Sequence, residues 1–274
     1  MRSIRALLGL AGALFLAFSV ELRALPKKPI GLDVLPSLLE LQAAPGETIE
    51  RSVTLTNPGE EALDVSAEAA DWTMSEKGEI RFDVAGSNPR SCAGWIRVTP
   101  SAIRVPPMGQ ATVSVRVGAP VDLDGTRWAV VFFRLPDAAG YHEGRPADLV
   151  ARVGLTVYVT GSGTEREWLD LTDLTATGAP EILLRASFDN GGNTAVRVKM
   201  TWQIRAASGS VVRTNAATVV CLPGSRREAV DRVPDLPPGA YKVSGMARWG
   251  NRRWKVRECV LEVPAKPSKA ARLS

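Results

Sequence analysis

The chain has few of the residues from which active sites and metal centres are usually built. Its 274 residues include one histidine, His142, and three cysteines, none of which form a Cys-x-x-Cys pair. A metal site needs several His, Cys or carboxylate ligands at close spacing, and His142 has no such neighbours. The sequence contains no nucleophile elbow, and no Ser-His-Asp triad is possible without His142. We therefore expect a protein that is not an enzyme and holds no cofactor and no metal.

Long apolar runs are also scarce, and the one present lies at the N-terminus. Ala6 to Val20 is almost unbroken, follows Arg2 and Arg5, and precedes small residues. This pattern is typical of a secretory signal, which we assign to residues 1–24, and an uncleaved membrane anchor is the open alternative. No later segment approaches transmembrane length. We expect a mature protein in the periplasm, without a transmembrane segment or a nucleic-acid partner.

Helical periodicity is missing as well, since no segment sustains it for three turns. Short strand-like runs instead recur about every ten residues, separated by Gly, Pro, Asn and Asp. Leu149 to Val159 has apolar residues at every odd position, and Thr194 to Arg205 alternates in the same way. Arg127 to Leu135 is apolar on both faces, as expected of a central strand. The pattern predicts an all-β protein with two immunoglobulin-like β-sandwich domains in tandem.

The Gly-, Ser- and Thr-containing stretch at 161–167 is the best candidate for a linker between the two domains. We therefore place the first domain at 25–160, the second at 168–264, and a basic tail at 265–274. Residues 25–164 contain 13 Lys and Arg against 17 Asp and Glu, whereas residues 165–274 contain 18 against 11. Such an asymmetry is consistent with two domains that have different surfaces.

The cysteines allow one disulfide. Cys221 and Cys259 both lie in strand-like segments of the second domain, and an oxidising compartment would permit them to pair. Closing that loop would contribute about 3–4 kcal/mol in the chain-entropy model. Unpaired thiols are the open alternative. Cys92 is expected to be a lone, buried thiol.

A basic cluster surrounds a predicted two-residue hairpin turn at Gly250-Asn251. Arg248, Arg252, Arg253 and Lys255 lie there beside two tryptophans. Basic side chains interleaved with aromatic rings can contact an anionic surface polymer. The alternative is a solvated hairpin tip whose tryptophans pack against the sandwich.

Three stretches of the first domain carry strand-like patterns separated by turn residues. They are ERSVTLTNPGEEALDVSAEAADW (50–72), WIRVTPSAIRVPPMGQATVSVRV (95–117) and RWAVVFFRLP (127–136). In order and spacing, the domain resembles the N-terminal immunoglobulin-like domain of periplasmic pilus-assembly chaperones of the PapD type. The stretch ADLVARVGLTVYV (147–159) falls where that family has the strand that complements pilus subunits. The second domain resembles a generic immunoglobulin-like module of bacterial secreted proteins.

The resemblance implies a function by β-augmentation, in which an incomplete subunit receives a strand from the chaperone. Its partners would be secreted, pilin-like subunits or other envelope proteins, and the contacting residues would be Ala147, Leu149, Ala151 and Val153. In that family an Arg on the first strand and a Lys on the complementing strand grip the subunit's C-terminal carboxylate. Here Gly31 to Leu41, which we interpret as the first strand, contains no Arg or Lys, and Gly154 stands at the Lys position. We therefore assign no anchor residue.

Two functions follow from these patterns. The first is a periplasmic, chaperone-like protein that binds or helps to assemble secreted pilus or surface subunits by β-strand complementation. The second is a secreted structural or adhesive module that binds an envelope protein or an anionic surface polymer.

Overall fold

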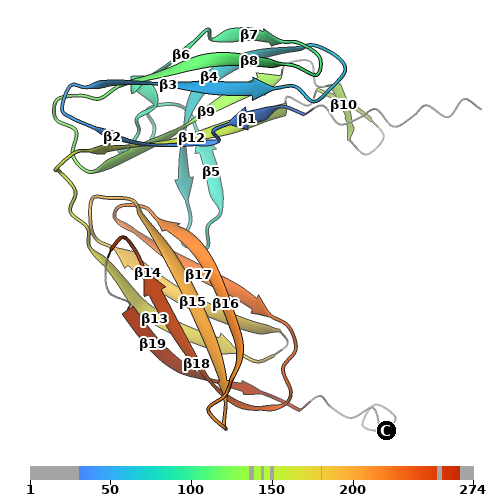
Figure 1. Ribbon diagram of the computed structural model, residues 1–274, viewed down its shortest axis with the longest axis vertical. Helices are drawn as coiled ribbons and strands as arrows, with labels where there is room; N and C mark the ends of the chain where they lie inside the picture. Colours follow the sequence, from blue (N-terminus) through green and yellow to red (C-terminus); the bar gives the residue numbers. More distant parts are fainter. Residues whose placement is uncertain are drawn as a thin grey trace, which may run out of the picture. The chain divides into compact units, whose positions relative to one another are not determined.

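The computed structural model describes residues 31–135, 139–142, 145–148, 151–179, 181–251 and 255–265, without the side chains of 139–142 and 145–148. In these ranges the chain is built from β-strands, with a single 3-10 turn, η1 (Ala93–Trp95). The strands form two β-sandwiches (Figure 1). The predicted all-β fold class is confirmed. The predicted signal segment, residues 1–24, lies outside the described residues.

Two sheets face each other in the first sandwich. One has the order β1-β3-β8-β6, and the other has the order β2-β12-β9-β4-β5, with β7 also paired to β4. The strands of the first sheet are β1 (Asp33–Leu35), β3 (Thr48–Thr56), β8 (Gln110–Gly118) and β6 (Ile96–Thr99). Those of the second are β2 (Leu38–Ala43), β12 (Ala151–Gly161), β9 (Thr126–Leu135), β4 (Leu63–Met74), β5 (Ile80–Asp83) and β7 (Ala102–Val105).

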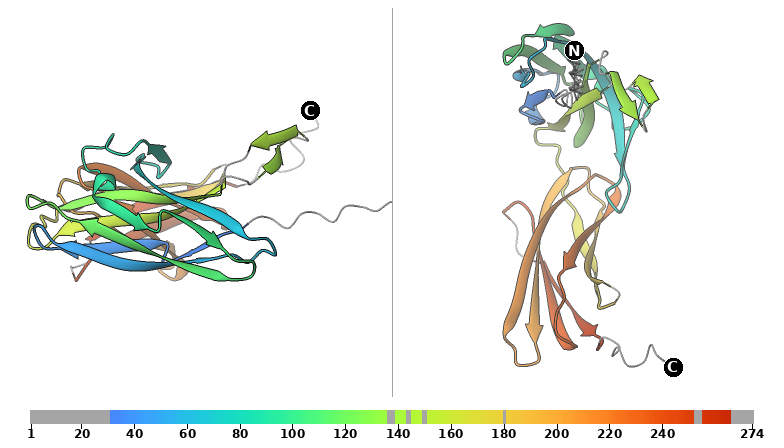
Figure 2. Two further views of the ribbon diagram at one scale, coloured as in Figure 1. Left: turned by 90° about the horizontal axis from the view of Figure 1, so that it is seen from above. Right: turned by 90° about the vertical axis from the view of Figure 1, so that its right-hand side faces the viewer.

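The second sandwich has a three-stranded sheet, β13-β14-β17, and a four-stranded sheet, β16-β15-β18-β19. Its strands are β13 (Leu169–Thr177), β14 (Ile182–Asn190), β17 (Ser225–Val233), β16 (Val211–Cys221), β15 (Val196–Ala206), β18 (Gly239–Arg248) and β19 (Lys255–Val263). β10 (Ala139–His142) and β11 (Arg145–Asp148) form a separate two-stranded sheet (Figure 2). The proposed domain boundaries themselves stay predictions.

Alternation of apolar and polar residues decides which side of each strand faces a core. In β12, Leu155, Val157 and Val159 are fully buried in the core of the first sandwich, as the odd-position pattern predicts. In β15 the predicted apolar face is buried in the core of the second sandwich. β9 lies between β12 and β4 and is buried on both faces, which explains its unbroken apolar sequence.

Two predicted segment boundaries are wrong. The segment Gly31 to Leu41 is not one strand: β1 pairs with β3, and β2 pairs in parallel with β12 in the opposite sheet. Pro36 lies between them and has no N–H to donate, so it favours a break in the ladder. The hairpin formed by β18 and β19 exists, but Ala247 pairs with Lys255, whereas a two-residue turn at Gly250-Asn251 would pair Ala247 with residue 254.

Tyr241 fastens one end of the second sandwich. Its hydroxyl donates a hydrogen bond to the carbonyl of Pro237, at 2.7 Å. This is the tyrosine-corner type of packing that a tyrosine just after a Pro-Gly turn favours. No helix among the described residues has the length and apolar character required to cross a membrane.

Candidate functional site: the open edge of β12 and its groove

β12 has a strand partner on one side along almost its whole length, but on the other side along only half of it. It pairs with β9 over Ala151–Thr160, whereas β2 pairs with it only from Thr156 to Gly161. No strand in the described part of the chain covers the β2 side of residues 151–155. An uncovered edge presents unpaired N–H and C=O groups, to which another chain can add a strand.

The hydrogen-bond pattern identifies the backbone groups at this edge. The N–H of Thr156 donates to the carbonyl of Ser37, at 3.0 Å, so residue 156 points its backbone groups toward the β2 side. Backbone groups alternate sides along a strand, so those of Arg152 and Gly154 point the same way. We call the stretch from Ala151 to Leu155 the open edge.

Side chains of the open edge point to two different environments. Ala151 and Val153 pack at the margin of the first core, and Leu155 is fully buried in it. Arg152 and Gly154 face the opposite way and line a groove with a volume of about 560 Å³. The open edge therefore has an apolar face and a groove face.

The groove is mainly aromatic and apolar. Its walls come from β2, β4, β5, β9 and β12 of the first sandwich and from β15 and β16 of the second, all within the unit Gly31–Ser274. Two β5 side chains in the wall, Ile80 and Phe82, remain 52% and 42% exposed. Exposed apolar side chains gathered in a concave surface mark a binding site more often than isolated ones do.

Two cationic side chains line the groove, and Arg152 is the one that lies on the open edge. Its guanidinium carbon lies 4.1 Å from the ring centroid of Phe132 and 5.2 Å from that of Phe82. Two aromatic faces thus hold the charge by cation–π attraction. No carboxylate among the described residues forms an ion pair with it. The guanidinium therefore keeps donors available for an acceptor from outside.

The second cation, Arg197 of β15, is already engaged. Its Nε donates to the Glu40 carboxylate at 2.7 Å, and its guanidinium lies 6.0 Å from the ring centroid of Tyr158. Burial raises the pKa of Tyr158 to about 12, although Arg197 acts in the opposite direction. Tyr158 is therefore a protonated phenol at neutral pH, and Trp72 packs edge-on against it.

A polar cluster joins the two sandwiches. The side-chain amide of Asn193 donates to Asp124 at 3.0 Å and to the Thr164 carbonyl at 2.9 Å. Its amide oxygen accepts the N–H of Arg166 at 2.7 Å. The Arg166 guanidinium also donates twice to Asp124, at 3.1 and 2.9 Å. Hydrogen bonds from Arg166 and Asn193 lower the pKa of the Asp124 carboxyl.

The β4–β5 hairpin makes a separate connection. The N–H of Glu228 in β17 donates to the carbonyl of Glu76 at 2.7 Å, and Arg227 donates to the same carbonyl at 3.1 Å. Arg227 also lies over Gly78, where a Cβ would come within 2.3 Å of its guanidinium. The hairpin that carries Ile80 and Phe82 is thus fastened at its tip to the second sandwich.

The predicted partner-binding residues are only partly brought together. Ala151 and Val153 lie on the apolar face of the open edge. Ala147 lies in β11, which pairs with β10 instead. Leu149 lies outside the described residues. Arg152, which points to the groove, was missed in the sequence because a polar residue at an even position of a strand is ordinarily solvated.

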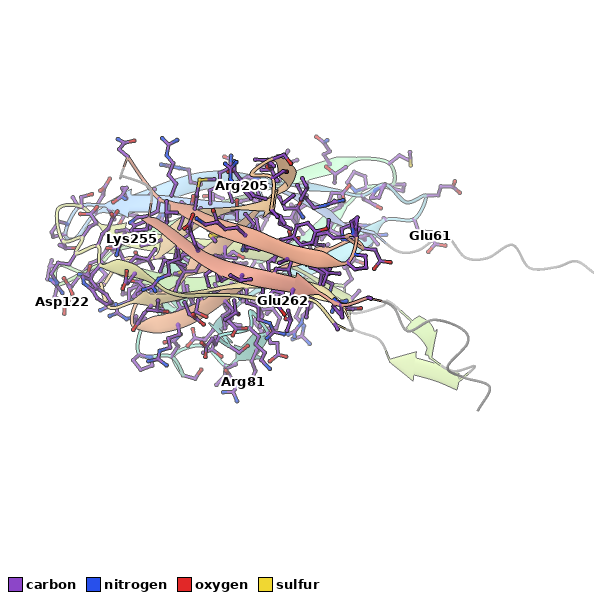
Figure 3. All side chains as sticks on the ribbon, turned by 90° about the horizontal axis from the view of Figure 1, so that it is seen from below. Glu61, Arg81, Asp122, Arg205, Lys255 and Glu262 are labelled. Carbon is purple, nitrogen blue, oxygen red and sulfur yellow. The ribbon has the colours of Figure 1, made fainter. Side chains whose placement is uncertain are left out.

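The basic hairpin cluster is less available than the sequence suggests. Lys255 donates to the carboxylate of Asp170. Arg248 is the last residue of β18, and Arg252 and Arg253 lie outside the described residues. Lys255, labelled in Figure 3, keeps 47% of its side chain exposed in its ion pair with Asp170. These positions favour a solvated surface for the described members of the cluster.

The proposed disulfide is not formed, and Cys92, Cys221 and Cys259 are free thiols. Cys221 is in β16 and Cys259 in β19, with β15 and β18 between them in the sheet. Three steps of about 4.8 Å separate these strands, whereas a disulfide needs Cα atoms within about 7 Å of each other. Cys92 is fully buried, as expected.

We predict that the native protein reacts slowly with a maleimide at all three cysteines. Burial raises the pKa of Cys221 to about 12 and also raises the pKa values of Cys92 and Cys259, so the reactive thiolate is scarce at neutral pH. Mass spectrometry should find three labels after unfolding without reductant. A product with one label would instead indicate a disulfide.

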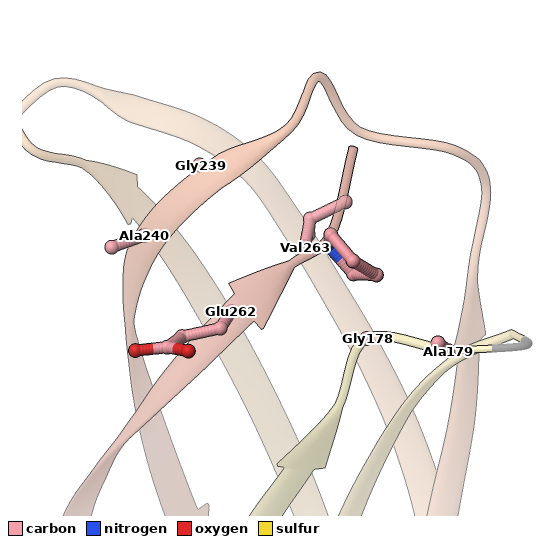
Figure 4. Close-up of a pocket in the computed structure, with 7 residues that line it drawn as sticks. Gly178, Ala179, Gly239, Ala240, Glu262 and Val263 are labelled. Atoms are coloured by element: carbon pink, nitrogen blue, oxygen red, sulfur yellow. The ribbon is translucent and has the colours of Figure 1, made fainter. Parts of the chain in front are cut away.

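No group of three or more His, Cys, Asp or Glu residues in the described ranges is placed to hold a metal. The side chain of His142 lies outside them. A pocket at one end of the second sandwich is lined by small residues, and Glu262 is its one titratable side chain (Figure 4).

No protein-family model and no curated protein matches this chain. Among solved structures, a chaperone–tip adhesin complex of CFA/I fimbriae matches with 12% identity over 86% of this chain and all of that chain, with a TM-score of 0.46. The CsuC–CsuE complex, from archaic chaperone-usher pili of Acinetobacter baumannii, matches with 11% identity, the same coverage and a TM-score of 0.46. The CupB2 chaperone of Pseudomonas aeruginosa matches with 12% identity over 82% and 98% of the two chains, with a TM-score of 0.41. At these values the fold assignment rests on the strand topology above.

Proposed function

We propose that this protein is a periplasmic chaperone that binds secreted subunits of a pilus or similar surface appendage by completing their sheets. The observation that carries the proposal is the open edge of β12, where β9 covers one side and β2 stops at Thr156. The backbone groups of Arg152 and Gly154 would form the ladder with an incoming strand. The half-exposed side chains of Ala151 and Val153, at the margin of the first core, would contact the apolar core of the subunit.

The sequence resemblance of residues 31–160 to pilus-assembly chaperones supports the same assignment. The ordered conformation of the open edge is consistent with the assignment too. A strand binds most tightly to an edge that is already ordered, because less conformational entropy is lost on binding. Over residues 151–155 the ladder to β9 is continuous, and Leu155 is fully buried. The edge is therefore held in an extended conformation before any partner arrives.

A proline at position 152 tests the proposal. The N–H of Arg152 points away from β9, so Arg152→Pro removes a donor of the open edge and leaves the β9 ladder intact. We expect Arg152→Pro to fold normally and to lose subunit binding by at least tenfold. Arg152→Ala, which keeps the N–H but also lacks the guanidinium, is the matched control and should bind clearly more tightly than the proline variant.

Binding is best measured by photo-crosslinking in the periplasm from a benzophenone amino acid at Val153. The expected adduct is a small secreted β-sandwich subunit that lacks one strand, and Arg152→Pro should abolish it. An adduct of equal yield in the proline variant would contradict strand addition. The absence of any adduct with such a subunit would contradict the chaperone function.

A further inference from the structure

We propose that the strand received by the open edge carries a large aromatic residue opposite Gly154 and an acidic residue two positions away, opposite Arg152. The inference rests on the proposed function and adds a recognition rule for the partner. It concerns the groove face of the edge, whereas strand addition itself needs only the backbone and the apolar face.

The geometry of a β-ladder fixes which side chains meet. Residues directly opposite each other on neighbouring strands lie on the same face, with Cβ atoms about 4.5–5.5 Å apart. Arg152 and Gly154 both line the groove. The partner residues opposite them must therefore also point into the groove, between the β12 surface and the Ser37–Leu38 end of the groove wall.

Gly154 lets other side chains approach this face of β12 closely, and Phe132, directly opposite on β9, already does so. The φ angle of Gly154 is not in the left-handed region, so the backbone does not require a glycine there. A Cβ at this position would lie 3.1 Å from Cγ2 of Val130 and 3.5 Å from Cε1 of Phe132. Glycine in the interior of a strand often marks the close approach of another group. An aromatic ring from the adjacent strand can lie over such a glycine and cover the apolar atoms beside it.

Arg152 supplies the second element of the rule. The rings of Phe132 and Phe82 fix its guanidinium, and no carboxylate in the described ranges is paired with it. Oppositely charged residues across a ladder attract, and like charges repel. An acidic residue opposite Arg152 would therefore be favoured, and a lysine would be rejected. The aromatic walls also exclude water from one side of the pair, which strengthens the discrimination.

The order of the two residues depends on strand direction. A strand parallel to β12 would carry acidic-x-aromatic, and an antiparallel strand would carry aromatic-x-acidic. Both patterns place the same two side chains at Arg152 and Gly154. The pattern that binds more tightly would thus show whether the partner strand runs parallel or antiparallel to β12.

The test uses the full chain and ten-residue synthetic peptides with four alternating apolar residues on one face. The other face carries Glu-x-Phe, Phe-x-Glu, Lys-x-Phe, Phe-x-Lys or Ala-x-Ala. We expect one of the two Glu peptides to bind at least tenfold more tightly than the Ala peptide, measured by fluorescence anisotropy. Its Lys counterpart should bind at least fivefold more weakly than the Glu peptide.

Two variants assign the preference to these residues. Arg152→Glu should reverse the order of the Glu and Lys peptides, whereas Arg51→Glu, an equal charge change on β3, should leave it unchanged. Gly154→Ala adds only the Cβ and should weaken the preference for Phe over Ala. Equal binding of all the peptides would overturn the recognition rule. The proposed function would remain intact if the bound peptides protect the amides of Arg152 and Gly154 from hydrogen exchange. If no peptide protects those amides, both proposals fail.

Discussion

Replacing Trp202 by alanine is expected to lower the free energy of unfolding of the second sandwich by about 3–5 kcal/mol. Trp202 lies in the middle of β15, is fully buried, and is among the largest side chains without exposed surface. Alanine would leave a cavity among close-packed neighbours such as Met200 and Phe188, which cannot collapse fully to fill it. Urea denaturation monitored by circular dichroism would measure the loss.

Trp202→Phe is the matched control, because it keeps an aromatic ring in the same place. The indole Nε1 of Trp202 is buried without a hydrogen-bond partner, and such an unsatisfied donor costs about 1–3 kcal/mol. Phenylalanine removes that donor and offsets part of the lost packing, so this variant should be clearly more stable than the alanine variant. Equal stabilities of the two variants would show that Trp202 does not fill the core.

Asn193→Ala is expected to have the second largest effect, a loss of about 2–4 kcal/mol. Its side chain is nearly fully buried, donates to Asp124 and to the Thr164 carbonyl, and accepts the N–H of Arg166. Alanine would leave the part-buried Thr164 carbonyl and Arg166 N–H without this partner, and Asp124 would keep only its bonds from Arg166. Because the cluster joins the sandwiches, we also expect easier proteolysis of the linker at 161–167, with the cores of both sandwiches preserved.

The same cluster predicts a dependence of stability on pH. Hydrogen bonds from Arg166 and Asn193 lower the folded-state pKa of Asp124. Its contribution to stability is therefore fully present above its unfolded pKa of about 3.9 and is lost as the pH falls through the lower, folded pKa. Asp124→Asn should reduce the acid sensitivity, measured as the urea midpoint between pH 2 and 6. An unchanged pH profile would exclude Asp124 as a source of the acid sensitivity.

Substitutions on the groove face of the open edge are expected to affect partner binding rather than folding. Changes on the groove face at Arg152 should alter partner selection with little effect on the unfolding midpoint. Changes on the core face, such as at Leu155, should do the opposite, because that side chain is fully buried. Comparing the two sets of variants separates recognition from stability along one strand.

The sequence alone determined the all-β class, because alternation with a period of two records which face of each strand is buried. The patterns of β9, β12 and β15 were sufficient for this, since each spans nine or more residues. Segment boundaries were less well determined. The break near Pro36 sends β1 and β2 to opposite sheets, and local propensity does not specify with which sheet a short strand pairs.

Only the tertiary structure decided where the site lies. The open edge exists because β2 stops at Thr156 of β12, and the two strands are more than a hundred residues apart in the chain. The groove depends on Phe82, Phe132 and Arg152 meeting from β5, β9 and β12. The unpaired state of Cys221 and Cys259 likewise follows from strand order. Each of these depends on long-range pairing, and a sequence pattern reports only which face of a strand is buried, not which strand lies beside it.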